Sequence, residues 1–387
     1  MNTAPLVECG FQAGSQIAPA EAIHTTPLGY DRAGLPAGTP LPIPASEELR
    51  DRLHGCREVE VAFRGKLGDT LLALSTARAL IDWLALHAPG VPLAVRATGP
   101  YAGLIARTGL VTQVPASAAN GKRALVGDPA AILADREEAE VSVVCDPAAP
   151  PCWSSDGRAH PDLPARYYLA LERRLGIRLP GAGPFAPVLA TGPSRFVDHL
   201  RSAGWLSGLT IAAITATSWP ERKDYTAQRF AELAERLANA HQREVHLLLI
   251  GGQSDAGVHI STGGPRRHVQ VLHLDGLSAD QLTDLFPLCD LVIGNDTGLT
   301  HLAALSRTPE SSGPPVVGLY ARHSHSKWRT GWPHHHAVAT GLSHRMHQGD
   351  LCPVRDAIAS DTDAHLDAIT PASLANLCAP LLNGGRR

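Results

Sequence analysis

Short, almost continuously apolar runs alternate along this chain with longer segments of helical periodicity, and this alternation constrains its fold most. Val245–Ile250 reads VHLLLI. Three other runs have a similar character: Leu209–Ile214, 291–294 and 315–319. A strand that is apolar on both faces is typical of a parallel sheet covered by helices on both sides. The sequence therefore predicts an α/β protein.

The segments between the runs carry apolar residues at a spacing that indicates helices. In the second half of the chain the predicted helices are 227–240, 278–288, 298–306 and 371–382. In the first half the predicted elements are a strand at 59–63, a loop at 64–69, a helix at 70–87, strands at 93–96 and 141–145, and a helix at 165–175.

The chain has 387 residues, which suggests two domains. Residues 1–55 are rich in Pro, Ala and Gly and lack sustained periodicity, so we expect an N-terminal extension. Residues 179–193 have the composition of a linker, and the α/β pattern restarts after them. We predict two Rossmann-like domains, 56–190 and 191–387, facing a cleft in which ligands bind beyond the carboxyl ends of the strands.

Charge and composition exclude several classes of function. The formal net charge is −3, so no basic field points to nucleic acid or to an anionic membrane as the main partner. No basic segment followed by an apolar run begins the chain, and no run is long enough to span a bilayer, so we expect a soluble, cytoplasmic protein. The seven cysteines form no C-x-x-C pair, which argues against a disulfide framework or a zinc site. Cys145 and Cys289 lie in apolar surroundings and are expected to be core thiols.

The strongest local signal follows the apolar run that ends at Gly294. Asn295-Asp296 continue the strand end, Thr297-Gly298 turn the chain, and a helix begins. The unpaired N–H groups and positive end of such a helix bind anions. Capping by the side chain of Asp296 or Thr297 would equally explain these residues. His301 would share a helix face with Thr297, and alone it would be read as a packing or surface residue.

Two further strand ends carry polar residues. Asp69 follows the first predicted strand and a glycine-bearing turn. It is either the N-cap of the next helix or a general base for a hydroxyl group. A charged segment, 219–225, follows the strand that ends at Ile214, and its Lys223 could neutralise a diphosphate. The alternative is a solvated charged loop.

Together these segments resemble glycosyltransferase family nine, the lipopolysaccharide heptosyltransferases. Asp296 to Leu302 resembles the family's D-[ST]-G-x-x-H-L donor motif, and Leu67-Gly68-Asp69 resembles its N-terminal L-G-D motif. Lys223, with Tyr225 and Phe230, partly matches its K-x-W-P-x-x-x-[FYW] pattern. The resemblance extends over roughly residues 58–382.

The resemblance implies a GT-B fold, with an acceptor domain at 56–190 and a donor domain at 191–387. It implies that Asp69 is the catalytic base and that Lys66 and Gly68 lie on the acceptor side. It also implies a set of donor-binding residues: Lys223, Asp255, Asp296, Thr297, Gly298, Leu299 and His301. Asp255 follows Gly251-Gly252 and would bind the ribose. No cofactor and no metal are expected, and the co-substrate would be a nucleoside-diphosphate sugar.

Two further patterns could suggest metal binding. Seven histidines lie between His323 and His347, in a spacing that matches no zinc signature, so we interpret the segment as a polar loop over the cleft. Its start overlaps the stretch 321–325, where the family usually has Gly-Pro-Thr. Asp361-Thr362-Asp363 is a D-x-D sequence that follows no apolar strand, and we interpret it as a turn.

The predicted reaction is a direct, inverting displacement. Asp69 would take the proton of an acceptor hydroxyl, while Lys223 and the N–H groups at Thr297–Leu299 would meet the charge of the leaving nucleoside diphosphate. The sugar would be a heptose or a related hexose. The acceptor could be a lipopolysaccharide core or a secondary metabolite such as an antibiotic, with membrane contact only for a lipid acceptor. A GT-B-like nucleotide-sugar epimerase and a non-catalytic nucleotide-binding module remain alternatives.

Overall fold

The computed structural model of the chain describes residues 7–9, 47–54, 58–87, 94–98, 101–110, 122–127, 141–145, 147, 152–153, 159–217, 220–252, 258–264, 268–308, 313–348 and 365–383. Contacts divide the chain into two compact units. The larger unit holds the described residues within Met1–Thr26, Thr191–Ser326 and Pro333–Arg387. The smaller unit holds those within Pro27–Ala190 and Lys327–Trp332.

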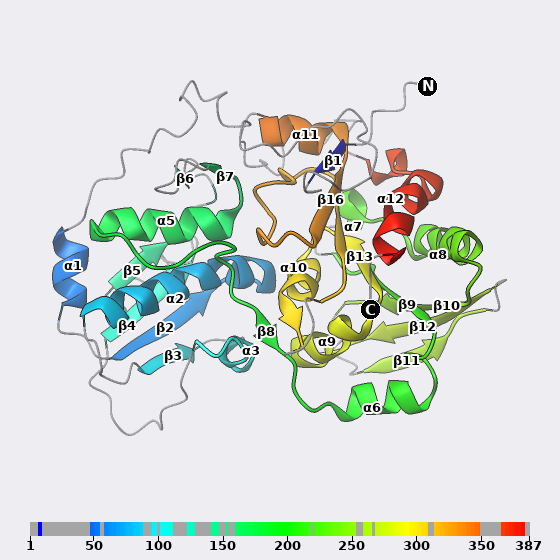
Figure 1. The fold of residues 1–387 in the computed structure, drawn as a ribbon, viewed down its shortest axis with the longest axis horizontal. Helices are drawn as coiled ribbons and strands as arrows, with labels where there is room; N and C mark the ends of the chain where they lie inside the picture. The colour runs from blue at the N-terminus through cyan, green and yellow to red at the C-terminus, as the bar shows by residue number, and fades with distance from the viewer. Residues whose placement is uncertain are drawn as a thin grey trace. The chain divides into compact units, whose positions relative to one another are not determined.

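The larger unit is built on an eight-stranded sheet in the order β1-β16-β15-β13-β9-β10-β12-β11, part of which is visible in Figure 1. Its strands are β1 (Val7–Cys9), β9 (Leu209–Ile214), β10 (Val245–Ile250), β11 (His259–Thr262), β12 (Val269–Asp275), β13 (Leu291–Asn295), β15 (Val316–Tyr320) and β16 (His335–Ala339). The six central strands are parallel, and only β1 and β11 at the edges run antiparallel. The predicted parallel sheet is confirmed.

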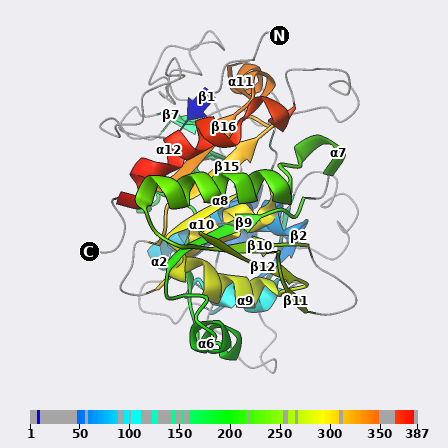
Figure 2. The same cartoon turned by 90° about the vertical axis from the view of Figure 1, so that its right-hand side faces the viewer.

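Helices cover both faces of this sheet. Alternate residues of the central strands, such as Ile211 and Ala213 of β9, enter one core cluster together with residues of α8 and α12. Figure 2 shows these two helices on one side of the strands, with α6 and α9 on the other. The helices of the unit are α6 (Arg195–Ser202), α7 (Pro220–Lys223), α8 (Ala227–His241), α9 (Ala279–Leu285), α10 (Gly298–Leu305), α11 (Gly341–Gln348) and α12 (Pro371–Asn383). Short elements at Phe286–Leu288, Ser306–Arg307 and Leu366–Ala368 complete it.

Gly294 allows β13 to approach its neighbours closely. A Cβ atom at this position would lie 2.6 Å from Ile214 Cβ and 2.8 Å from Thr300 Oγ1. We expect Gly294→Ala to lower the free energy of unfolding by about 1–3 kcal/mol, because neither neighbour can move without disturbing the sheet. Urea unfolding would measure this loss. Gly264→Ala is the matched control, since a Cβ there meets nothing within 4 Å; equal stability of the two variants would contradict the expectation.

The smaller unit has a four-stranded parallel sheet in the order β3-β2-β4-β5. Its helix α2 packs against α5, and Tyr168 of α5 donates a hydrogen bond to Asp82 of α2 at 2.5 Å. The elements are α1 (Glu47–Leu53), β2 (Glu58–Arg64), α2 (Leu67–His87), β3 (Ala94–Thr98), α3 (Ala102–Ala106), β4 (Lys122–Gly127), β5 (Val141–Val144), β6 (Cys152–Trp153), β7 (Ala159–His160), α5 (Leu163–Leu175) and β8 (Leu189–Ala190).

Several predicted boundaries need correction. Helix α2 begins at Leu67, three residues earlier than expected, so Asp69 lies inside its first turn and is not its N-cap. The expected extension 1–55 contains β1 and α1 among its described residues. The segment Lys327–Trp332 belongs to the smaller unit, where Lys327 donates to Pro147 O at 3.2 Å and Trp332 donates to Ala186 O at 2.9 Å.

One other expectation is met: Cys145 and Cys289 are buried, as predicted. Across the described part of the chain, no helix has the length and apolar character needed to cross a bilayer.

Candidate functional site

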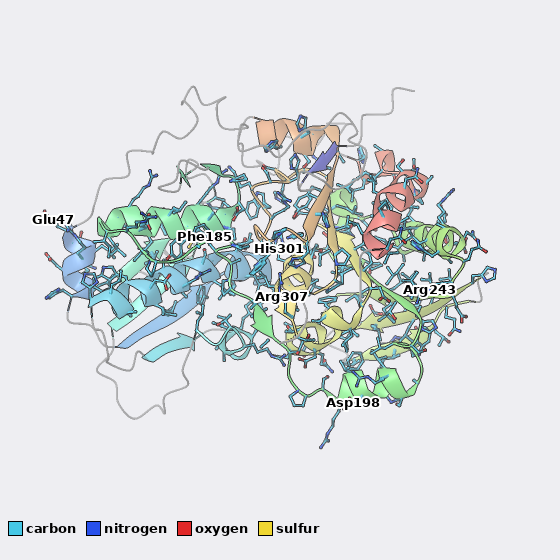
Figure 3. All side chains as sticks on the ribbon, viewed as in Figure 1. Glu47, Phe185, Asp198, Arg243, His301 and Arg307 are labelled. Atoms are coloured by element: carbon cyan, nitrogen blue, oxygen red, sulfur yellow. The ribbon has the colours of Figure 1, made fainter. Side chains whose placement is uncertain are left out.

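Polar residues gather where three neighbouring parallel strands of the larger unit end. Asn295 ends β13 and Asp296 follows it, His323 follows β15, and Lys223 ends α7, which follows β9. Since β9, β13 and β15 are adjacent and parallel, their carboxyl ends meet at one edge of the sheet. Helix α10 begins at the same edge, and Figure 3 shows His301 on it.

Lys223, Asp296 and His323 form a tight cluster, called here the Asp296 cluster. Lys223 Nζ lies 3.0 Å from Asp296 Oδ2, 3.4 Å from Asp296 O and 2.6 Å from His323 Nδ1. His323 Nδ1 also contacts Asp296 Oδ2. The side chains of Lys223 and Asp296 are only 8% and 5% exposed, whereas that of His323 is 18% exposed. The predicted donor-binding pair Lys223 and Asp296 is therefore in direct contact, and His323 joins it.

The charge of Asp296 is fixed by its partners. Burial alone would raise the pKa of this carboxyl, but the positive charge of Lys223 and the electrostatic and hydrogen-bond interactions of His323 outweigh burial and hold its pKa well below the usual range. Asp296 is thus ionised at neutral pH. The lysine and the carboxylate together make a buried ion pair at the sheet edge.

The start of α10 keeps polar groups without partners. Thr297 occupies the N-cap position, but its side chain makes no capping hydrogen bond. Within the described part of the chain, Thr297 Oγ1 and His301 Nδ1 are buried without a hydrogen-bond partner. The first N–H groups of any α-helix also lack partners within the helix. Side-chain capping by Thr297 therefore does not explain this segment, and its donors are available to an anion.

His301 is neutral at pH 7. Burial is the main cause that lowers its pKa to about 4, and Lys223 and His323 add to this effect while Asp296 opposes it. The unfolded chain therefore binds a proton that the folded chain does not between the ordinary value of 6.5 and about 4. The stability that the neutral ring supports is fully present above pH 6.5 and is lost as the pH falls through 4.

This linkage predicts a measurable pH dependence. We expect the unfolding free energy of the wild type to fall between about pH 6.5 and 4, and to fall less in His301→Asn, because the variant has no imidazole to protonate. Urea unfolding at several pH values would measure the difference. The difference between the two pH profiles of unfolding free energy reports on His301. The other buried histidine with a pKa lowered to about 4, His334, is present in both proteins. Parallel pH profiles would contradict the assignment.

Asn295 organises the site, although sequence reasoning did not assign it a role. It is fully buried, and its Oδ1 accepts the N–H of Tyr225 at 2.9 Å while its Nδ2 donates to Thr215 O at 3.2 Å. These bonds tie the end of β13 to the chain after β9 and fix the segment that carries Lys223. The side-chain amide directly after a buried strand was the available signal. Tyr225 itself is fully buried against Phe230 in the sheet core.

The remaining predicted site residues have other placements. Asp69, Lys66 and Gly68 belong to the smaller unit, where Gly68 and Asp69 lie in the first turn of α2 and Lys66 is exposed just before it. Gly65 has φ +140°, and a Cβ there would lie 3.3 Å from Asp69 Cβ, so glycine lets the turn close against Asp69. Asp255 lies outside the described residues, as does the Asp361-Thr362-Asp363 sequence.

A different acidic residue, Asp275, lies against the turn at Gly251. A Cβ on Gly251 would lie 1.5 Å from Asp275 Oδ1, which places the Asp275 carboxyl directly against this turn at the end of β12. Asp275 is therefore an acidic side chain at the carboxyl edge of the sheet that sequence reasoning missed. Its strand was not among the predicted ones.

Most of the histidine-rich segment is structured and buried in the larger unit. The rings of His325, His344 and His347 lie close together, with centroids 4.5–6.0 Å apart, and Ser326 Oγ lies 2.6 Å from His347 Nδ1. The interpretation of 323–347 as a polar loop is wrong for β16 and α11, which lie within it. In the described ranges, no three His, Cys, Asp or Glu side chains are arranged to hold a metal ion.

Comparison with known proteins identifies the family that one part of the chain resembles. Residues 194–355 match glycosyltransferase family 9 (heptosyltransferase). No curated protein matches the chain.

Three solved structures share its fold. A family 9 glycosyl transferase from Veillonella parvula DSM 2008 has a TM-score of 0.59 at 15% identity, over 85% of this chain and 98% of that one. The E. coli ADP-heptose lps heptosyltransferase II has a TM-score of 0.54 at 16% identity, over 84% and 98%. The iron-containing dodecameric glycosyltransferase TibC from enterotoxigenic E. coli H10407 has a TM-score of 0.50 at 14% identity, over 86% and 80%.

The family match covers β9, β13, β15 and the Asp296 cluster, and the likeness to solved structures shows the α/β fold. The predicted resemblance is confirmed over this part of the chain: residues 194–355 match glycosyltransferase family 9 (heptosyltransferase), and the chain is a glycosyltransferase.

Proposed function

We propose that this protein is an inverting, metal-independent glycosyltransferase that moves a heptose or a related hexose from a nucleoside-diphosphate sugar to an acceptor hydroxyl. The observation that carries the proposal is the meeting of Lys223 with the unpartnered start of α10 at one sheet edge. We place the diphosphate of the donor there. We propose ADP-heptose as the donor, because this is the nucleotide sugar after which the structurally similar E. coli heptosyltransferase II is named.

The charge at this edge suits a leaving diphosphate. The leaving group gains negative charge in the transition state, and preorganised donors that meet this charge lower the barrier. Lys223 supplies a full positive charge, while the N–H groups of Gly298 and Leu299 and the helix dipole of α10 supply partial ones. Thr297 and His301 add an unpartnered hydroxyl and ring nitrogen.

The base in this scheme is Asp69, with Lys66 and Gly68 beside it on the acceptor side. Asp69 is partly exposed in the first turn of α2, and a carboxylate there would accept the proton of the hydroxyl as the bond to the anomeric carbon forms. We propose that the acceptor is a glycan or a small molecule and that the reaction takes place in the cytoplasm. Membrane contact would arise only with a lipid acceptor.

The test begins with calorimetric titration of the full chain with ADP, GDP, UDP and TDP. Candidate nucleotide sugars are then incubated with acceptors, with and without EDTA, and the products are identified by mass spectrometry and by the anomeric configuration in NMR. We expect one nucleotide to bind, an acceptor-dependent product with inverted configuration, and no effect of EDTA. A product formed from the donor alone would favour an epimerase. Loss of transfer in EDTA, restored by a metal, would contradict the metal-free scheme.

A further inference from the structure

The three hydrogen-bond donors of Lys223 are already in use. An ammonium group has three N–H bonds. Lys223 Nζ has three acceptors within reach: Asp296 Oδ2 at 3.0 Å, Asp296 O at 3.4 Å and His323 Nδ1 at 2.6 Å. In this state Lys223 has no N–H left for a phosphate. A donor diphosphate can gain the ammonium only if one or more of these contacts is given up.

Giving up the contact with Asp296 would leave a buried charge alone. The Asp296 carboxylate is 5% exposed and ionised, and a buried charge that loses its partner is strongly destabilising. Two described groups besides Lys223 act on the charge of Asp296, namely His323 and His301. His301 cannot replace the lysine near neutral pH, because burial and the nearby charges lower its pKa to about 4. His323 is the group that remains.

His323 touches both charged partners through a single atom. Its Nδ1 lies 2.6 Å from Lys223 Nζ and also contacts Asp296 Oδ2. A ring nitrogen either accepts or donates a hydrogen bond, so the two contacts cannot both be hydrogen bonds at one time. With Nδ1 unprotonated the ring accepts from Lys223. With Nδ1 protonated it donates to Asp296, and as an imidazolium it also supplies the positive charge that Asp296 needs.

The position of His323 suits this exchange. Its ring is 18% exposed, more than the side chains of Lys223 and Asp296, so solvent can deliver a proton to it. Its backbone is held in place, since Ser343 Oγ donates to His323 O at 2.6 Å. Among the described groups, Asp296, Lys223 and His301 are charged or titratable and act on it or contact it.

We propose that nucleotide-sugar binding is coupled to the uptake of one proton at His323 Nδ1, which takes over from Lys223 as the positive partner of Asp296 and releases the lysine ammonium to the diphosphate. The proton comes from solvent, and no other bond is made or broken. His323 is thus a positioning residue that acts through Lys223. The proposal rests on the proposed function, because it assumes that Lys223 meets the donor phosphates.

Calorimetry in two buffers tests the coupling. The full chain is titrated with whichever of ADP, GDP, UDP and TDP binds most tightly, at about pH 8, where the terminal phosphate of the nucleotide is fully ionised. Buffers that differ in protonation enthalpy and are not phosphate anions, such as HEPES and Tris, then count the protons taken up. We expect about one proton per nucleotide, and an affinity that falls by about tenfold per pH unit above this point, as linkage requires.

His323→Asn is the test variant, since its amide places a polar group near the position of Nδ1 without a titratable proton. We expect this variant to bind the nucleotide with no proton uptake and with little dependence on pH. His365→Asn is the matched control, because His365 is exposed and outside the cluster, and it should behave as the wild type. If His323→Asn fails to fold, the wild-type measurement still decides.

The outcomes separate the two levels of the proposal. Nucleotide binding by the wild type without proton uptake, or equal uptake by wild type and His323→Asn, overturns the role of His323 and leaves the nucleotide site standing. Failure of the folded wild type to bind any of the four nucleotides overturns the proposed function, and the coupling with it.

Discussion

Replacing Asp69 by asparagine is expected to slow sugar transfer by about 10²–10⁴-fold while nucleotide binding stays unchanged, because the amide has nearly the same shape but cannot accept the proton of the acceptor hydroxyl. Asp69 lies in the first turn of α2, in the smaller unit, whereas the proposed nucleotide site lies in the larger one. Steady-state kinetics would show the loss in kcat, with little change in the KM of the donor.

A matched control accounts for the stabilising effect that this carboxylate has on its own helix. An acidic residue in the first turn of a helix stabilises it by about 0.3–1 kcal/mol, so Asp69→Asn also loses that term. Asp198→Asn removes the same term from α6, where Asp198 lies in the first turn and pairs only with Arg201 in the described contacts. This control should keep full transfer. Near-normal turnover by folded Asp69→Asn would end its assignment as the base.

Replacing Lys223 by methionine is expected to lower the free energy of unfolding by about 3–5 kcal/mol and to weaken nucleotide binding strongly. The loss of stability follows because Asp296 would remain buried without its main cation. The loss of binding follows because the variant lacks the ammonium proposed to meet the diphosphate. Urea unfolding and calorimetry measure the two effects separately.

The double variant Lys223→Met with Asp296→Asn separates the structural effect from the binding effect. Removing both charges of a buried pair is far less costly than removing one. We therefore expect the double variant to recover most of the lost stability and to remain unable to bind nucleotide. Recovery of binding together with stability would show that Lys223 acts only on the fold.

The strands of the larger unit were predictable because burial on both faces requires a continuous apolar run. Leu209–Ile214 and Val245–Ile250 were predicted to the residue. β16 was missed because it begins with His335-His336. Tertiary contacts bury these two polar rings, and the local sequence pattern does not indicate that burial. β12 was missed as well, and Asp275 at its end went unassigned. The predicted domain roles and the role of each site residue stay predictions.

The start of α2 shows a second limit of local reasoning. Gly68 and Asp69 were read as loop residues, because both types are common in turns. In the structure the helix begins at Leu67, two residues after Gly65, which has φ +140°. Because Gly65 completes the turn, the residues from Leu67 onward are helical. Asp69 consequently lies in the helix and not ahead of it.

The sequence by itself determined the α/β class, the resemblance to glycosyltransferase family 9, and the two segments that carry Lys223 and Asp296, because each depends on residues that are close together in the chain. Tertiary structure alone decided that these two side chains pair. They are 73 residues apart, and they meet because β13 lies beside β9 in the sheet and Asn295 ties the two strand ends together. It also decided that His323, visible in the sequence only as one of many histidines, completes the cluster. A charge relationship of this kind depends on distance and burial, and both are set by the order of the strands.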